Sequence, residues 1–500
     1  MARFPFIGPS YVHTSVAFDA QRCINLYTSL SETGNSSDAG LLIGTPGLKI
    51  FIDLPKNIIR GAHEVLGRCF VVAGNSVYEI FIDGSYIFIG DLISLNGHVS
   101  MADNGLQVCL VDGDNGYIIN LANDATWPNG TAMEWPDGTL IDWPSGALME
   151  TISDPDFVGA DTVTFADGYF AFNEPNTGRY YISELYNGLN IDSLEFASAE
   201  GSTDNLVAVK AVHNELWLFG VNSIEVAYNS ANLDFPYERI QGAFIEYGCI
   251  APFSVAKAAN TVFWLGNDKR GVGVVWMAEG YAPKRISTDA IEREIQSYAD
   301  ISDAISYTYQ EMGHHFFVIN FPAENTTLVY DISTGMWHER ASLNNGNIER
   351  HRAQVHVYIF NKHIVGDYHN GKLYQQNIDF YTDDGDPIYR ERTCPYLSDQ
   401  GDLDYFFFNR FQLEMESGVG LSSNDPYEAD PQIALSWSDD NARTWSNEIW
   451  RSAGKIGEYA KRLIWRRLGR SRKRVFKVST SIPCKVCFIS ASVKADRGDT

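Results

Sequence analysis

The chain has 500 residues and a net charge of −25, and 45% of its residues are hydrophobic and 13% aromatic. This length exceeds one ordinary hydrophobic core and predicts two or three domains. The acidic excess disfavours unspecific binding to nucleic acid or anionic lipid. No apolar run reaches the length of a membrane-spanning helix, about 18–20 residues, so we expect no membrane span. Abundant glycine and aromatic residues with few long helical patterns favour an all-β protein.

The N-terminal stretch MARFPFIGPSYV has no signal-peptide core, which indicates synthesis in a reducing cytoplasm. The seven cysteines are odd in number and mostly scattered, and Cys484 and Cys487 form a lone CxxC pair. A structural zinc site needs four ligands, and no second pair is spaced to supply them. We therefore expect buried cysteines that act as small apolar residues, and neither a metal nor a cofactor.

Strand, Gly or Asn turn, and strand recur from residue 56 to 390, at intervals of about 40–50 residues that are typical of propeller blades. The pattern predicts a β-propeller of six or seven blades over residues 56–390, after an N-terminal segment of residues 1–55. One helix is predicted within 287–301, where Asp289 as N-cap and Glu292 form a capping-box arrangement. The modules that carry the blade pattern are 67–90, 97–121, 162–183, 214–229, 260–280, 314–339 and 356–376.

A repeated loop interrupts the blade pattern at residues 122–152. WPNGTAME, WPDGTLID and WPSGALME follow one another from residue 127 to 150 with a period of eight residues. Pro restricts φ and Gly frees it, so each copy contains a tight turn. The loop should protrude from a blade edge, either as a duplicated surface loop without function or as a functional protrusion. The residues that would carry its function are Trp127, Trp135 and Trp143 and the acids Glu134, Asp142 and Glu150.

Residues 391–500 lose the blade pattern and predict a separate, β-sandwich-like C-terminal domain. Within it, 461–481 is interpreted as a basic hairpin that turns at Gly469–Lys473. Residues 451–477 hold eleven Lys or Arg and one acid, a net +10, which leaves 27 bases and 62 acids elsewhere. This segregation predicts an assembly interface, with a solvated strand pair and a DNA-binding surface as alternatives. Its candidate residues are Arg462, Arg466, Arg467, Arg470, Arg472, Lys473 and Arg474.

The stretch SDDNARTW, residues 438–445, resembles an Asp-box, the turn motif of sialidases and other propellers. It occurs once, Ala442 stands where Gly is usual, and the blades lack an Arg cluster for a substrate carboxylate. We interpret it as a structural turn in which Ser438 and Asp440 bind backbone and Trp445 packs in the core. Zinc-protease, phosphate-loop and nucleophile-elbow motifs are absent too. We expect no enzyme and no catalytic residue; the alternative is a sialidase-like propeller that binds a host receptor or glycan.

Short motifs along nearly the whole chain resemble the packaged-DNA stabilisation proteins of short-tailed bacteriophages, which form the tail nozzle or tail hub. The single motifs are short, but their order along the chain is specific. They are QRCINLY (21–27), GTPGL (44–48), IRGAH (59–63), VSMADNG (99–105), DPDF (154–157), FASAEG (196–201), ELWLFGVNSIEV (215–226), VFWLGND (262–268), RIST (285–288), and then SDDNARTWS, GEYAKRLIWRRLG and RVFKVS. The Trp-Pro-x-Gly repeat is not part of this resemblance.

The resemblance implies a structural protein of the virion tail, assembled as a hexameric ring of propeller subunits. The ring would lie below the portal and the tail adaptor ring, close the channel, retain packaged DNA and conduct it during ejection. Its implied partners are a tail needle or plug, a tailspike or fibre, and double-stranded DNA in passage. An acidic lumen would repel DNA and let it slide, the basic segment would face an acidic partner, and the repeated loop would lie at the channel mouth or on the outer wall.

Overall fold

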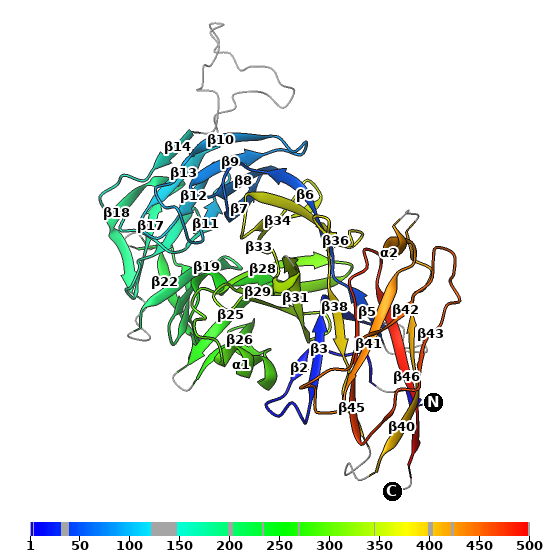
Figure 1. Ribbon diagram of the computed structural model, residues 1–500. Helices are drawn as coiled ribbons and strands as arrows, with labels where there is room; N and C mark the ends of the chain where they lie inside the picture. Colours follow the sequence, from blue (N-terminus) through cyan, green and yellow to red (C-terminus); the bar gives the residue numbers. More distant parts are fainter. Residues whose placement is uncertain are drawn as a thin grey trace.

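The protein consists of a disc-shaped propeller and an elongated sandwich that lie side by side, with both chain ends on the sandwich (Figure 1). This confirms the predicted fold class. The computed structural model describes residues 2–3, 5–31, 40–121, 148–198, 204–232, 235–268, 271–344, 346–398, 404–421 and 425–498. Within this part of the chain no helix is long and apolar enough to cross a membrane.

Seven antiparallel blades surround one axis in the described ranges, which agrees with the expected six or seven (Figure 1). Their strands, from the axis outward, are β7 (Ile59–Val65), β8 (Arg68–Ala73), β9 (Ser76–Ile80) and β10 (Tyr86–Asp91); β11 (Ser100–Asp103), β12 (Gln107–Val111), β13 (Gly116–Asn120) and β14 (Leu148–Thr151); β15 (Val163–Ala166), β16 (Tyr169–Asn173), β17 (Arg179–Glu184) and β18 (Asn187–Ser198); β19 (Leu206–Val212), β20 (Glu215–Gly220), β21 (Ile224–Asn229) and β22 (Tyr237–Ile245); β24 (Ala256–Ala258), β25 (Thr261–Asp268), β26 (Gly271–Glu279) and β27 (Ala282–Arg285), with β23 (Gly248–Cys249) beside β25; β28 (Ile305–Glu311), β29 (His314–Phe321), β30 (Thr326–Asp331) and β31 (Met336–Asn344), with β32 (Asn347–Arg350) beside β31; and β33 (Ala353–Ile359), β34 (Lys362–Asp367) and β35 (Lys372–Asn377) with β6 (Gly47–Asp53).

Six of the seven blades share one turn between their first two strands. Each turn is a two-residue loop with both residues at positive φ, the type I′ geometry that matches the twist of a hairpin. The second residue of every pair is Gly or Asn, which tolerate this conformation. The pairs are Leu66–Gly67, Asp167–Gly168, His213–Asn214, Ala259–Asn260, Met312–Gly313 and Phe360–Asn361.

Hydrogen bonds link each blade to the next around the whole ring. Strand β6 supplies the outer strand of the last blade by pairing with β35, so the N-terminal part of the chain completes the propeller. The seven links, each donor first, are Val99 N to Arg60 O (3.1 Å), Val163 N to Ser100 Oγ (3.1 Å), Val209 N to Thr162 Oγ1 (3.0 Å), Lys257 Nζ to Ala211 O (3.0 Å), Ser306 Oγ to Ser254 O (2.7 Å), Asn320 Nδ2 to Ala353 O (3.3 Å) and Gln354 Nε2 to Ile59 O (3.0 Å).

The helix predicted within 287–301 is present as α1 (Asp289–Gln296), after a short 3₁₀ turn η1 (Pro252–Ser254) earlier in the same blade. Its N-cap is Thr288 and not Asp289, because the Thr288 side chain accepts from the amide of Ile291 at 3.4 Å. Glu292 does not complete a capping box. Its carboxylate accepts from Arg285 and from the Ser287 hydroxyl instead.

The C-terminal domain is a sandwich of two sheets. The core between them contains the buried rings of Phe411, Trp465 and Phe476; the Phe411 and Phe476 centroids are 4.9 Å apart. One sheet has the order β4 (Leu26–Leu30), β5 (Gly40–Gly44), β46 (Cys487–Arg497), β40 (Phe406–Met415) and β43 (Leu463–Arg466), with β1 (Ala2–Arg3) and β44 (Arg470–Ser471) at its margins. The other has β3 (Ala20–Ile24), β38 (Arg390–Thr393), β45 (Lys473–Thr480), β41 (Gln432–Ser438) and β42 (Ile449–Ser452), with β2 (Tyr11–Val12) and β39 (Leu397–Ser398). The short elements α2 (Pro426–Ala429), β36 (Thr382–Asp383) and β37 (Asp386–Pro387) lie outside both sheets.

The prediction of a basic hairpin over residues 461–481 is wrong. Strands β43 and β44 both pair with β40 in one sheet, whereas β45 pairs with β41 and β38 in the other. The chain between β44 and β45 therefore crosses from one sheet of the sandwich to the other. Leu463, Trp465 and Leu468 are buried between the sheets. The apolar residues of this segment therefore pack in the core between the two sheets, and its strands do not pair with each other.

A continuous sheet joins the propeller to the sandwich. Strand β3 pairs parallel with β31 of the sixth blade and antiparallel with β38 of the sandwich. The first 55 residues are thus divided: β1, β4 and β5 belong to the sandwich, β3 to the joint and β6 to the last blade. The side chain of Arg392, which is fully buried, binds the N-terminal segment at this joint. It donates to Phe6 O (2.7 Å), Pro9 O (2.9 Å) and Gln21 Oε1 (2.6 Å).

Candidate functional site

Five arginines form an exposed row along one margin of the sandwich, which we call the basic edge. Strand β43 is the last strand of its sheet and lies on the side of the sandwich away from the propeller (Figure 1). The members are Arg462, Arg466, Arg467, Arg470 and Arg472. None of the five forms an ion pair with a carboxylate among the residues that the structure describes. Five unneutralised guanidinium groups on a strongly acidic protein make this margin suited to an acidic partner.

Part of the basic edge is held in place by an aromatic ring. The guanidinium groups of Arg470 and Arg472 lie over the ring of Tyr405, at 5.0 and 4.6 Å from its centroid. Such cation–π contacts contribute roughly 0.5–1 kcal/mol at exposed sites. They orient the two side chains while leaving their N–H groups free for a partner.

Arg474 is not part of an exposed surface, contrary to the prediction. Its guanidinium is buried and binds the carboxylate of Asp439 through two hydrogen bonds of 2.6 and 2.7 Å. It also lies over the ring of Phe408 at 4.5 Å. Lys473 is half-buried, with its ammonium 4.1 Å from the centroid of Tyr396. Both residues stabilise the sandwich from within.

The Asp-box stretch forms a tight turn after β41. Ser438 Oγ accepts from the amide of Ala442 at 2.9 Å, and the carboxylate of Asp440 accepts from the Thr444 hydroxyl (2.6 Å) and amide (2.9 Å). The hydrogen bonds to the Asp440 carboxylate, of which that from the Thr444 hydroxyl has the largest effect, hold the pKa of Asp440 below its usual value. The turn is therefore weakened as the pH falls through the acidic range. Every one of these groups is engaged with the turn itself, which supports the structural interpretation.

Trp445 of this turn is half-buried and does not lie in the core, contrary to the prediction. The ammonium of Lys477 covers its ring, 4.4 Å from the centroid. The ring is thus part of the domain surface, shielded on one side by a lysine of β45.

Replacing Ala442 by glycine should stabilise the sandwich, because Ala442 has φ 62°. A non-glycine residue in this left-handed region costs about 1–2 kcal/mol. We expect the free energy of unfolding to rise by about 1 kcal/mol, measured by chemical denaturation. Ala434→Gly, inside strand β41, is the control and should lower stability. An Ala442→Gly protein no more stable than the parent would show that the turn is not strained.

Five of the six candidate residues of the repeated loop lie outside the described residues: Trp127, Glu134, Trp135, Asp142 and Trp143. Glu150 is described, and it lies in β14, where its carboxylate accepts from Asn120 Nδ2 at 3.2 Å. The segment leaves from β13 and returns at β14, the outer strands of the second blade. Its attachment is therefore on the rim of the disc, beside β10 and away from the propeller axis (Figure 1).

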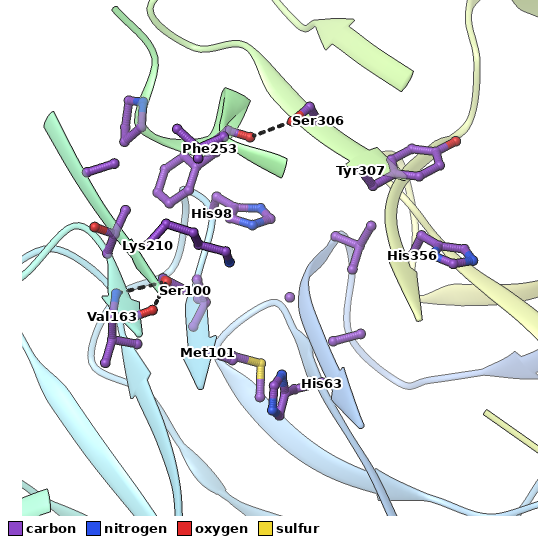
Figure 2. Close-up of a pocket in the computed structure, with 18 of the residues that line it drawn as sticks. His63, His98, Ser100, Met101, Val163, Lys210, Phe253, Ser306, Tyr307 and His356 are labelled. Atoms are coloured by element: carbon purple, nitrogen blue, oxygen red, sulfur yellow. Dashed lines mark hydrogen bonds between the residues drawn. The ribbon is translucent and has the colours of Figure 1, made fainter. Parts of the chain in front are cut away.

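The propeller axis contains a small cavity lined by residues from all seven blades (Figure 2). Its volume is about 240 Å³. A cavity of this volume is too small for a DNA double helix, whose major groove alone is about 12 Å wide. A double helix therefore does not fit through the axis of one propeller. Nothing in the sequence identified this cavity, because each blade contributes only two to four residues to it.

All seven cysteines are buried and free, as predicted. Burial raises the pKa of Cys484 to about 12 and that of Cys487 to about 11, so neither is a ready thiolate. Among the described residues no group of His, Cys, Asp and Glu side chains is arranged to hold a metal ion.

Fold and site together define a two-domain, all-β protein in which a propeller and a sandwich share one sheet. The chain belongs to the family of Bacteriophage P22 Gp10: the β-propeller model of that family matches residues 2–380 and its β-sandwich model matches residues 389–496. A curated relative, the tail hub protein gp10 of Salmonella phage P22, is 22% identical over 474 residues, which are 90% of this chain and 90% of that protein. The chain is accordingly a structural protein of a bacteriophage tail.

Two of the solved structures that this chain resembles do so at low identity and low TM-score. The WD40 β-propeller domain of Doa1 is 11% identical, with 66% of this chain and 96% of that chain covered and a TM-score of 0.37. The extracellular domain of the two-component system BT4673 from B. thetaiotaomicron is 10% identical, with 75% and 45% covered and a TM-score of 0.41.

Proposed function

We propose that the protein forms the tail nozzle: a ring that closes the portal channel, retains packaged DNA and conducts it during ejection. The observation that carries this proposal is the match of both domains, in the same order, to a tail hub protein over nine tenths of each chain. A structural role of this kind needs no catalytic residue, and we propose none.

The DNA path would run between copies of the chain. Because the axial cavity of one propeller measures only about 240 Å³, a duplex needs a wider opening, which several subunits around a common axis provide. We propose a six-fold ring below the portal and its adaptor ring. Outside 451–477 the chain has 62 acids and 27 bases. An acidic lumen would offer few basic groups to bind the DNA phosphates, so the DNA would slide through it.

The basic edge would serve assembly. Its arginines lack carboxylate partners among the described residues, so they are available for an acidic surface of a neighbouring subunit or of the adaptor ring. Charged surfaces of opposite sign speed docking and set its register. A tail needle or plug and a tailspike or fibre are the further partners that we propose for such a ring.

Virions made without the protein test this function. We expect heads that fill with DNA and then lose it, because the channel stays open. The measurement is the fraction of full heads by electron microscopy, together with nuclease-accessible DNA. Heads that stay full without the protein would contradict a role in DNA retention.

Deleting residues 127–147, which leaves strand β14 intact, tests the place of the repeated loop in the ring. At the channel mouth, the loop would help to retain DNA, so its deletion yields complete tails with leaking heads. On the outer wall it would meet a spike or fibre, so heads stay full and adsorption to the host falls. The rim attachment allows both arrangements. If neither retention nor adsorption changes, the loop is a duplication without function.

A further inference from the structure

The axial cavity of the propeller has an unusual charge composition for so acidic a protein. Its lining includes one lysine and three histidines but no Asp or Glu. Two of the histidines have partners outside the cavity: His63 Nε2 lies 2.7 Å from Asp103 Oδ2, and His356 Nε2 lies 3.0 Å from His363 Nδ1. Lys210 and His98 remain as the polar groups that face the cavity without such partners.

Lys210 extends from β19 into the space between His98 and Ser100 (Figure 2). It makes no hydrogen bond and no ion pair with any residue that the structure describes. The Lys210 side chain is half-buried, so its ammonium loses part of its hydration without gaining a counter-charge, which is costly. Neighbours of like charge increase this cost, since the ammonium of Lys257 lies close enough to lower the pKa of Lys210 further.

His98 adds an unused polar atom at the same place. Its Nδ1 is buried and has no hydrogen-bond partner among the described residues, and its ring lies 4.5 Å from that of Phe253. The guanidinium of Arg60 is close enough to lower the pKa of His98. It donates only to carbonyl and hydroxyl oxygens, and the carboxylate of Asp112 offsets part of its charge. Lys210, with Lys257 nearby, thus gives the cavity a positive charge, and no Asp or Glu lines its wall.

We propose that the axial cavity binds a small inorganic anion, held by the ammonium of Lys210 and the imidazole of His98. A volume of about 240 Å³ accommodates several water molecules, so a tetrahedral oxyanion of the phosphate type fits with part of its hydration. The anion supplies the missing counter-charge at the point where all seven blades meet. It thereby stabilises the arrangement of the blades, in addition to the hydrogen bonds between them.

The protonation states agree with this assignment. Burial, with a smaller contribution from Lys257, lowers the pKa of Lys210 to about 8, so the group is mostly an ammonium at pH 7. Burial, followed by Arg60 and Lys210, lowers the pKa of His98 to about 4. Its neutral ring can still donate one N–H to the anion.

Thermal unfolding of the full chain tests the proposal. The probe is inorganic phosphate, added to a gluconate buffer at constant ionic strength. We expect the unfolding temperature of the propeller to rise with phosphate concentration and then saturate. In Lys210→Met this saturable rise is lost. Lys284→Met, at an exposed lysine of the outer strand β27, should keep it, and so should a protein with serine at four arginines of the basic edge.

A second comparison separates ligand binding from a purely structural lysine. Without phosphate, Lys210→Met should be at least as stable as the parent, because the substitution removes an unpaired charge from a half-buried position. By calorimetry, phosphate should bind at least tenfold more weakly to Lys210→Met, with Lys210→Gln as a second variant. Equal phosphate responses of parent and Lys210 variants, or no saturable response of the parent, would overturn the proposal and leave a cavity that holds water only.

Discussion

Arg392→Ala should lower the free energy of unfolding by about 3–5 kcal/mol, the largest effect that we expect from one side chain. The buried guanidinium donates to Phe6 O, Pro9 O and the Gln21 amide oxygen. Its loss leaves one buried and two partly buried acceptors without this donor, and an unsatisfied buried acceptor costs about 1–3 kcal/mol. These acceptors lie on the N-terminal segment beside β3, the strand that joins the two domains, so we expect the joint to loosen before either core melts.

Calorimetry and limited proteolysis of the N-terminal segment measure this effect. Arg443→Ala, at an exposed arginine of the same domain, is the matched control and should change little. Arg392→Lys should be intermediate, since one ammonium cannot reach all the acceptors of a planar guanidinium. An Arg392→Ala protein as stable as the Arg443→Ala control would mean that the joint does not depend on these bonds.

Replacing Arg466, Arg467, Arg470 and Arg472 by serine should weaken assembly about 10- to 1,000-fold. Each exposed charge pair contributes roughly 0.2–1 kcal/mol, and about 1.4 kcal/mol corresponds to a tenfold change in affinity. The measurement is the concentration dependence of ring formation, or of binding to the adaptor, by analytical ultracentrifugation. Because salt screens such pairs, the difference from the parent should shrink as ionic strength rises.

Charge-preserving and charge-reversing variants complete this test. Lysine at the same four positions should restore most of the assembly, and glutamate should weaken it more than serine does. All four side chains are exposed, so the fold should survive each change. Normal assembly of the serine and glutamate variants would show that the basic edge is only a solvated surface.

The blades could be predicted from sequence because each is built from local pairings. Alternating apolar residues and a Gly or Asn turn specify a hairpin within about 20 residues, and six of the blades repeat the same two-residue turn. Strand β6 could not be assigned to the last blade, since its partner β35 is more than 300 residues away in the chain. Non-local pairing leaves no mark in the periodicity of either strand.

The strand partners of the basic segment, residues 461–481, could not be predicted from the sequence either. Residues 461–481 alternate as two strands would, which suggested a hairpin, but the partners of β43 and β45 are β40 and β41. Alternation indicates that a strand has a buried face and says nothing about which strand lies beside it. Arg474 and Arg470 are likewise indistinguishable by composition; only the fold places Arg474 in the core, with Asp439 as its partner.

The axial cavity and the joint had no detectable sequence signal. Lys210 stands in an ordinary alternating strand, LVAVKAV, and Arg392 in the short strand RERT. Their roles arise from residues that other blades and the N-terminal segment bring to them. The residues that surround each of these two charges are therefore known only from the structure.

An electron cryomicroscopy reconstruction of the virion tail tests the central claim most directly. The account predicts a ring of six copies below the adaptor, with a central opening wide enough for a duplex and the basic edge against an acidic neighbouring surface. DNA density should lie between the copies and not along the axis of any one propeller. Single copies on the periphery of the tail, with no common opening, would contradict the proposal.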